Sequence, residues 1–330
     1  MSIISRVEPL VQANVKDLTG HEAAMYLDAV PTSSSRSRSK SGKSRGHLLS
    51  KLCAVAAVAA TVLISVGQAH AAAVRTNAGF TGSTLPRNDD GSTGAVNIGF
   101  TTDFYGSSFS QLFVNNNGNV TFDGALGTYT PFNLNTTNRQ IIAPFFADVD
   151  TRNLASGVVQ YGNDTVNGRT AFGVNWRNVG YYNTQAVPTN DFQLVLIDRS
   201  DTGAGNFDFE FNYDRILWET GSASGGGAGG LGGNSARAGF AGGPAGDRTT
   251  FELAGSAING AFLDTNTSTG LIHNNFNSST DGRYVFQVRN GQVATAPVPE
   301  PETWAMMGLG LIALVAVARR RKSTTALSVA

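Results

Sequence analysis

One segment of the chain alternates large aromatic residues with polar ones. Its aromatic members are Phe207, Phe209, Phe211 and Tyr213, and its polar members are Asp208, Glu210 and Asn212. Because successive side chains of a β-strand point to opposite faces, a period of two predicts a strand with one dry face and one wet face. No amphipathic helical pattern of useful length occurs between Ala72 and Val298. The sequence of this region therefore favours an all-β fold.

A run rich in asparagine and glycine indicates a hairpin. Gln111–Val114 and Asn119–Phe122 flank Asn115–Gly118, whose residue types tolerate positive φ. Further strands are predicted at Ile141–Ala147, Val158–Tyr161, Ala171–Val179, Phe192–Asp198, Ile216–Trp218, Ala236–Phe240, Thr249–Leu253 and Arg283–Val288. Many short strands joined by polar turns predict a sandwich or a jelly-roll-like pair of sheets. Gly221–Gly233, which is nearly all Gly, Ser and Ala, is predicted to be a mobile surface loop.

The C-terminal thirty residues combine three features in a fixed order. The tripeptide Pro299, Glu300 and Pro301 comes first, an apolar run over 304–318 follows, and the basic cluster Arg319, Arg320, Arg321 and Lys322 comes last. As an α-helix the apolar run would be about 22 Å long, against a hydrocarbon core of about 30 Å. We expect a short transmembrane helix, with the basic cluster as a membrane stop and 323–330 as a cytoplasmic tail. The region before Pro299 is then exported.

The N-terminal region, 1–71, reads as a leader with a secretory signal peptide. Basic residues precede the apolar stretch Leu52–Val66, which is predicted to form the signal helix. Ala69 and Ala71 provide small residues at both positions that determine signal cleavage. We therefore expect the exported chain to begin at Ala72.

The exported region differs in charge from the whole chain. Between Ala72 and Val298 there are 12 arginines, no lysine and 18 acidic residues, which gives a formal charge of −6. Nucleic acid is a poor partner for such a surface, because phosphate binding depends on clustered cations. The region also has no cysteine and a single histidine, His273, which excludes disulfides and thiol or zinc chemistry.

The C-terminal arrangement over 299–322 resembles the PEP-CTERM sorting signal of Gram-negative bacteria. In that family the Pro-Glu-Pro tripeptide is a recognition element for exosortase, a membrane protease-transpeptidase. The resemblance implies an exosortase-type processing enzyme as a partner and a transient stay at the inner membrane. Delivery to the cell surface or the extracellular matrix would follow.

The exported region resembles the nidogen-like domain. The motifs that carry the resemblance are Leu85–Gly91, Leu112–Phe122, Ile142–Asp150, Phe192–Asp198, Phe207–Asp214, Trp218–Gly221 and Ala236–Phe240. They cover roughly Thr84 to Leu263, and we place the domain at 72–290 with a linker over 291–298. The resemblance implies an extracellular module of adhesion and matrix proteins, with extracellular polysaccharide or matrix proteins as partners and no enzymatic activity.

Asp148 and Asp150 allow three interpretations. They stand two apart on one predicted strand, so their side chains share a face. The leading interpretation makes them hydrogen-bonding residues where a strand meets a loop. The second makes them ligands of Ca²⁺, the one cofactor that we consider. The third is a polysaccharide-acting enzyme with paired carboxylates, its cleft lined by aromatic residues such as Tyr181, Tyr182 or Trp218.

We assign no catalytic residue from the sequence. The sequence does not fix the carboxylate separation that a glycosidase needs, and it shows no motif that pairs a nucleophile with a base. We therefore expect a protein that is not an enzyme. A stably anchored membrane protein, whose tail is never cut, is the other alternative to a processed surface protein.

Overall fold

The structure is a computed structural model that describes residues 72–243 and 250–295. These residues form fourteen strands and five short 3-10 turns, with no α-helix among them. None of the described residues belongs to a helix long and apolar enough to cross a membrane. The predicted signal helix, Ala69 and Ala71, the tripeptide 299–301, the helix over 304–318 and the stop over 319–322 lie outside the described residues.

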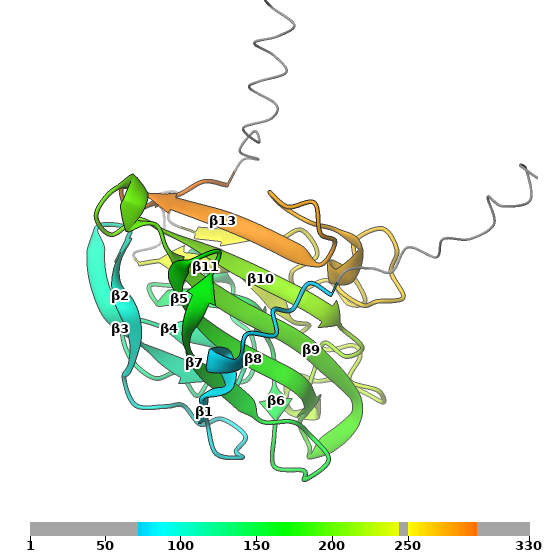
Figure 1. The fold of residues 1–330 in the computed structure, drawn as a ribbon. Helices are drawn as coiled ribbons and strands as arrows, with labels where there is room; N and C mark the ends of the chain where they lie inside the picture. The colour runs from blue at the N-terminus through cyan, green and yellow to red at the C-terminus, as the bar shows by residue number, and fades with distance from the viewer. Residues whose placement is uncertain (1–71, 244–249, 296–330) are drawn as a thin grey trace, which may run out of the picture. The chain divides into compact units, whose positions relative to one another are not determined.

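The strands form two antiparallel sheets, which pack face to face (Figure 1). The eight-stranded sheet has the order β1 (Ser83–Thr84), β7 (Val159–Val166), β8 (Arg169–Tyr181), β9 (Gln185–Asp198), β10 (Phe207–Arg215), β13 (Arg283–Arg289) and β14 (Gln292–Val293), and β6 (Val149–Asp150) also pairs with β8. The six-stranded sheet has the order β12 (Thr250–Glu252), β11 (Arg237–Gly242), β5 (Gln140–Phe146), β4 (Asn119–Thr121), β3 (Ser107–Asn115) and β2 (Val96–Phe104). The 3-10 turns are η1 (Ala78–Thr81), η2 (Leu134–Thr136), η3 (Ser200–Thr202), η4 (Ser222–Ser224) and η5 (Leu271–His273). The predicted all-β architecture of two sheets is confirmed for these residues.

Aromatic side chains fill the space between the sheets. Phe209 of β10 contacts the ring of Phe240 in β11 at 5.5 Å between centroids and stacks on Phe286 of β13 at 4.9 Å. Trp176, which is fully buried, stacks on Phe192 at 5.1 Å. Offset and edge-to-face pairs of this kind add to the burial of apolar surface, which supplies most of the folding free energy of a domain without disulfides.

Most predicted strands are present, and one is not. Ile216–Trp218 forms no strand, because side chains bind the backbone N–H groups that a neighbouring strand would otherwise take. Asp264 accepts from the Ile216 N–H at 2.8 Å, and Asn190 accepts from the next two N–H groups at 2.7 and 3.2 Å. Strand β2 was not predicted, since its polar and glycine residues hide the alternation. Gln292 and Val293, placed in the linker from the sequence, form β14 against β13.

The polar face of β10 is covered rather than wet, so that part of the prediction is wrong. Asp208, Glu210 and Asn212 are 8, 4 and 0% exposed. The segment from Ala72 to Thr76 runs across this face, where Arg75 makes two hydrogen bonds to Glu210 at 2.6 and 2.8 Å (Figure 1). A strand can therefore alternate in sequence and still be buried on both faces when charged side chains pair above it.

The glycine-rich loop over 221–233 is more ordered than its composition suggests. It contains η4, and the Gly227 N–H donates to Leu231 O at 2.7 Å. The loop is tied to the chain before it, since Gly230 O accepts from the N–H groups of both Glu219 and Thr220 at 2.9 Å. The predicted surface loop is thus a hydrogen-bonded one, and its mobility stays a prediction.

Candidate functional site

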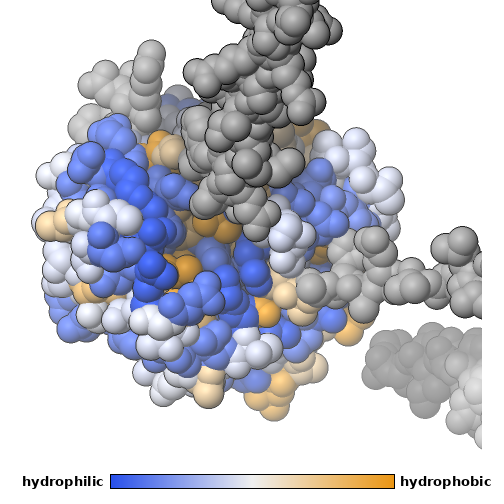
Figure 2. Space-filling model, turned by 45° about the horizontal axis from the view of Figure 1, so that its top comes forward, coloured by the Kyte–Doolittle hydropathy of each residue, from blue (hydrophilic) through white to orange (hydrophobic). Residues whose placement is uncertain are grey.

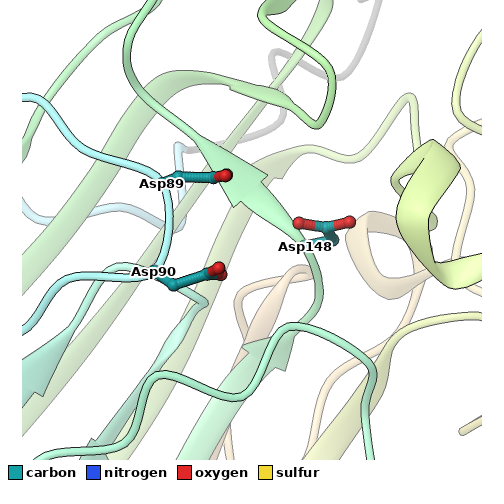
Figure 3. A group of neighbouring side chains, drawn as sticks. All are labelled: Asp89, Asp90 and Asp148. Atoms are coloured by element: carbon teal, nitrogen blue, oxygen red, sulfur yellow. The ribbon is translucent and has the colours of Figure 1, made fainter.

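Three carboxylates meet at one end of the sandwich. Asp89 and Asp90 belong to the loop between β1 and β2, and Asp148 lies where the chain passes from β5 in one sheet to β6 in the other. One oxygen from each residue lies within 4.8 Å of the other two. Figure 3 shows the three side chains directed toward one another. They line a cavity of about 180 Å³ together with Tyr129, Tyr182 and Ala223.

The hairpin turn between β3 and β4 holds these segments at a fixed separation. The Asn116 side-chain amide donates to the backbone oxygens of Asp89 and Val149, both at 2.5 Å. Asn117 donates to Asp90 Oδ1 at 2.8 Å, and its own oxygen accepts from the Val149 N–H at 3.0 Å. Both asparagines are buried, so the turn acts as a brace behind the carboxylates as well as a reversal of the chain.

Two carboxylate oxygens of the cluster have no hydrogen-bond partner. Asp148 is 1% exposed, and its Oδ2 is buried without a partner, as is Oδ1 of Asp89. Burial, followed by repulsion from Asp89 and Asp90, raises the pKa of Asp148 to about 7. Burial and the charges of Asp150 and Asp90 raise the pKa of Asp89 to about 6. The site therefore holds negative charge that the surrounding protein does not fully compensate.

Asp150 faces a different set of partners. Its carboxylate makes an ion pair with Arg152 at 2.5 Å and accepts from the Thr184 N–H at 2.8 Å. Hydrogen bonds from Arg152 and Thr184 outweigh the effect of burial and lower its pKa. Arg152 also approaches Asp89 Oδ2 at 3.2 Å. Of the two residues considered for calcium from the sequence, the structure brings Asp148 into the acidic cavity and places Asp150 in an ion pair beside it.

A glycine lies directly against the Asp148 carboxylate. A Cβ atom on Gly221 would overlap Oδ2 and the carboxylate carbon of Asp148. The backbone of Gly221 is in the extended region, with φ −77° and ψ 159°, so its conformation does not require glycine. Close approach to Asp148 is the reason that a larger residue does not fit.

The aromatic residues considered for a sugar cleft do not line one together. Trp218 is fully buried and Tyr181 is 5% exposed, and the two rings pack on each other in the core at 5.3 Å. Tyr182, on the other hand, lines the acidic cavity. The structure thus separates the three aromatic residues and leaves only one next to the carboxylates.

Asp89 and Asp90 were not singled out from the sequence as possible ligands. They lie 58 residues or more from Asp148, and no local spacing links them. The one available signal was the sequence Asn88-Asp89-Asp90-Gly91, which is typical of a tight polar turn. Which strand end such a turn meets depends on the tertiary fold.

Two family models match the chain. The nidogen-like domain matches residues 110–290, more than half of the chain, and the PEP-CTERM protein-sorting motif matches residues 297–322. The first match begins after Asp89 and Asp90, so the acidic cavity combines residues from inside and outside the matched segment.

Curated proteins with similar sequences come from animals. Alpha-tectorin of Mus musculus is 36% identical over 181 residues, which cover 48% of this chain and 8% of the tectorin. Nidogen of Drosophila melanogaster is 30% identical over 118 residues, which cover 28% of this chain and 8% of that nidogen. Nidogen-2 of Mus musculus is 33% identical over 150 residues, 36% of this chain and 11% of the relative. The chain thus matches only a small part of each relative, and no solved structure matches it significantly.

Proposed function

The chain belongs to the nidogen-like domain family and carries a PEP-CTERM protein-sorting motif, and from this pairing we propose that it is a binding or structural component of a bacterial extracellular matrix. The two matches together support an exported protein of the cell surface or the extracellular space. The finer assignment, adhesion to extracellular polysaccharide or matrix proteins, is our inference from the family.

We infer the following route for the protein. The signal over 1–71 directs export and is removed after Ala71. The helix over 304–318 then holds the protein at the inner membrane of a Gram-negative cell. An exosortase-type enzyme cuts near Pro299, Glu300 and Pro301 and passes the domain to the cell surface or the matrix.

The described surface suits contact with hydrated polymer. Hydrophilic residues prevail over the face in Figure 2, and hydrophobic residues appear there in small separate groups. The exposed large apolar residues of the described region are far apart in sequence: Tyr129, Leu154, Val187, Leu217, Leu231 and Ile258. A polar surface of this kind favours many weak contacts with a solvated partner over one large apolar interface.

The arrangement of carboxylates argues against a polysaccharide-acting enzyme. Such an enzyme needs one carboxylate as acid and a second, free carboxylate as base or nucleophile across a sugar-sized cleft. Asp150 is engaged by Arg152 and Thr184, and the cavity beside Asp148 has a volume of only about 180 Å³. The geometry therefore favours a role in binding or structure.

Substitution of the sorting tripeptide tests the proposal. In a strain that produces the full chain, changing Pro299, Glu300 and Pro301 to alanine should leave the protein in the membrane fraction and deplete it from the matrix. The matched control is the single variant Glu302→Ala, which changes the residue next to an intact tripeptide. Its protein should be delivered normally. The secreted protein should also sediment with isolated extracellular polymer. Normal delivery of the triple variant, or a secreted protein that stays in the supernatant, would contradict the proposal.

A further inference from the structure

The acidic cavity contains a buried charged group that nothing in the described protein satisfies. Asp148 is 99% buried, and its Oδ2 has no hydrogen-bond partner. The residue lines the cavity that Asp89 and Asp90 also line. Burying a carboxylate is costly unless another group compensates its charge. Asp89 adds a second buried oxygen without a partner. Both residues with an unpartnered oxygen, Asp148 and Asp89, line the same cavity.

Nearby cations do not compensate the cluster. Arg152 is the arginine that pairs with Asp89, at 3.2 Å, and its shorter contact, 2.5 Å, is to Asp150. The same guanidinium thus serves two carboxylates. Asp90 Oδ1 accepts from the neutral amide of Asn117, which contributes no charge.

We propose that Asp89, Asp90 and Asp148 bind one calcium ion, which fastens the loop after β1 to the crossing point between the two sheets. Ca²⁺ binds oxygen ligands at about 2.3–2.6 Å, so two oxygens on one ion can be separated by up to about 5 Å. The three carboxylate oxygens, all within 4.8 Å of one another, meet this pairwise limit. Water fills the remaining coordination positions.

The position is built before an ion arrives. Asn116 and Asn117 fix both segments through the turn of the β3–β4 hairpin, and Tyr182 N–H donates to Asp148 O at 3.1 Å. Gly221 packs closely against the Asp148 carboxylate. A preformed set of hard carboxylate oxygens favours Ca²⁺ over Mg²⁺, which keeps most of its water and requires bonds of about 2.0–2.1 Å.

The test uses the secreted full-length mature protein, stripped with EDTA and dialysed. Calcium chloride alone is titrated by calorimetry, and the melting temperature is measured in EDTA, in about 10 mM Ca²⁺ and in about 10 mM Mg²⁺ at matched ionic strength. Extracellular calcium modules have dissociation constants of about 10⁻⁴ M at the tighter end, so this concentration is about 100 times that value. We expect calcium to raise the melting temperature by about 5–10 °C, and magnesium by less than half as much.

Variants show whether the ion sits at this cluster. Asp148→Asn should weaken calcium binding at least about tenfold and remove the thermal shift, because it takes away a charged ligand. Its melting temperature in EDTA should be no lower than that of the wild type. If that variant does not fold, Asp90→Asn should give the same loss. Asp201→Asn removes an exposed carboxylate in a different ion pair and should keep the full shift.

Three results would overturn the inference. One is an absence of binding heat together with melting temperatures that agree within about 1 °C in calcium and in EDTA. Another is an unchanged calcium shift in Asp148→Asn, which would place the ion elsewhere. The last is an equal response to magnesium and calcium, which would contradict the assignment to calcium.

Discussion

At the scale of single residues, the structure depends on close contacts between backbone and buried polar groups. Glu219 is an example beside the glycine-rich loop, since it is 1% exposed and accepts from the N–H groups of Gly260 and Phe262 at 2.6 and 2.8 Å. Gly221 is another, because its missing side chain leaves room for Asp148. Both residues follow β10 and belong to the Trp218–Gly221 motif of the nidogen-like resemblance.

Replacing Gly221 with alanine should destabilise the protein. The new methyl group would overlap the Asp148 carboxylate, and forcing such a group into a packed site costs about 1–3 kcal/mol in the free energy of unfolding. Gly227→Ala is the matched control in the same loop, since its Cβ would have ordinary contact at 3.6 Å with Leu231 O. Urea denaturation of both variants measures the difference. Equal stability of the two variants would show that Asp148 moves aside freely.

The stability conferred by Glu219 should depend on pH. Burial raises its pKa above the ordinary 4.5, so the folded state holds this proton more tightly than the unfolded state does. The resulting stability is complete below pH 4.5 and is lost as the pH rises through the folded pKa, at up to about 1.4 kcal/mol per pH unit. Glu219→Gln cannot titrate, so its stability deficit against the wild type should shrink as the pH rises above 4.5. A deficit that is constant from pH 4 to about pH 8 would contradict the raised pKa.

At the scale of elements, the N-terminal segment and strand β10 hold each other in place. Glu210 of β10 is buried under the segment after Ala72, and that segment is fixed because Glu210 offers it a carboxylate. Asp208 is instead covered by Arg199 and Arg289. Val74 N–H donates to Asp214 Oδ1 at 3.0 Å, and Arg75 N–H donates to Gln193 at 3.0 Å. The alternation over 207–213 predicted the strand and its inner face correctly. It could not predict the cover on the outer face, part of which comes from Arg75, 135 positions from Glu210.

Arg75→Ala should weaken this attachment. Removal of the arginine leaves Glu210, which is 4% exposed, without its strongest partner, and breaking a buried pair of this kind costs about 3–5 kcal/mol. We expect about 2–3 kcal/mol here, because Arg283 and Asn212 stay within reach of the same carboxylate. Arg169→Ala breaks an exposed pair with Asp201, in which the side chains are 40% and 46% exposed, and should cost much less because solvent screens the pair. Equal losses in the two variants would refute the docking of the segment.

The packing of Phe209 should contribute much of the free energy that holds the two sheets together. The Phe209 ring contacts aromatic rings on its own strand, on β13 and on β11 of the opposite sheet, so its truncation leaves a cavity at the centre of the core. Phe209→Ala is expected to lose about 3–5 kcal/mol of unfolding free energy. Leu154→Ala, at a residue 84% exposed, should change it by no more than about 0.5 kcal/mol. A loss below about 1 kcal/mol for Phe209→Ala would indicate a core that collapses around the gap.

At the scale of the whole molecule, the sequence predicted what depends on local pattern. Alternation and turn residues gave the all-β architecture, the β3–β4 hairpin and the inner face of β10. Of the residues that line the acidic cavity, only Asp148 and Tyr182 were considered from the sequence, because Asp89 and Asp90 reach it from a distant loop through Asn116 and Asn117. Those two asparagines were interpreted as turn residues alone. Side-chain acceptors that replace strand partners, as Asn190 does for Leu217, likewise leave no periodic signal.

Cleavage at the two predicted sites should leave the contacts of the β-domain intact. Ala72 is exposed, whereas Ala73 and Val74 are buried, so cleavage after Ala71 leaves every docking contact in place and a deeper cut would remove them. At the other end, the Ala294 N–H still donates to Gln287 O at 2.9 Å, and a cut near Pro299 spares this contact. Intact mass spectrometry of the secreted species should therefore give a chain from Ala72 to about Pro299. A membrane species that retains Arg319–Lys322 as the end product would support the stably anchored alternative, and uncut chains in the cytosol would contradict export.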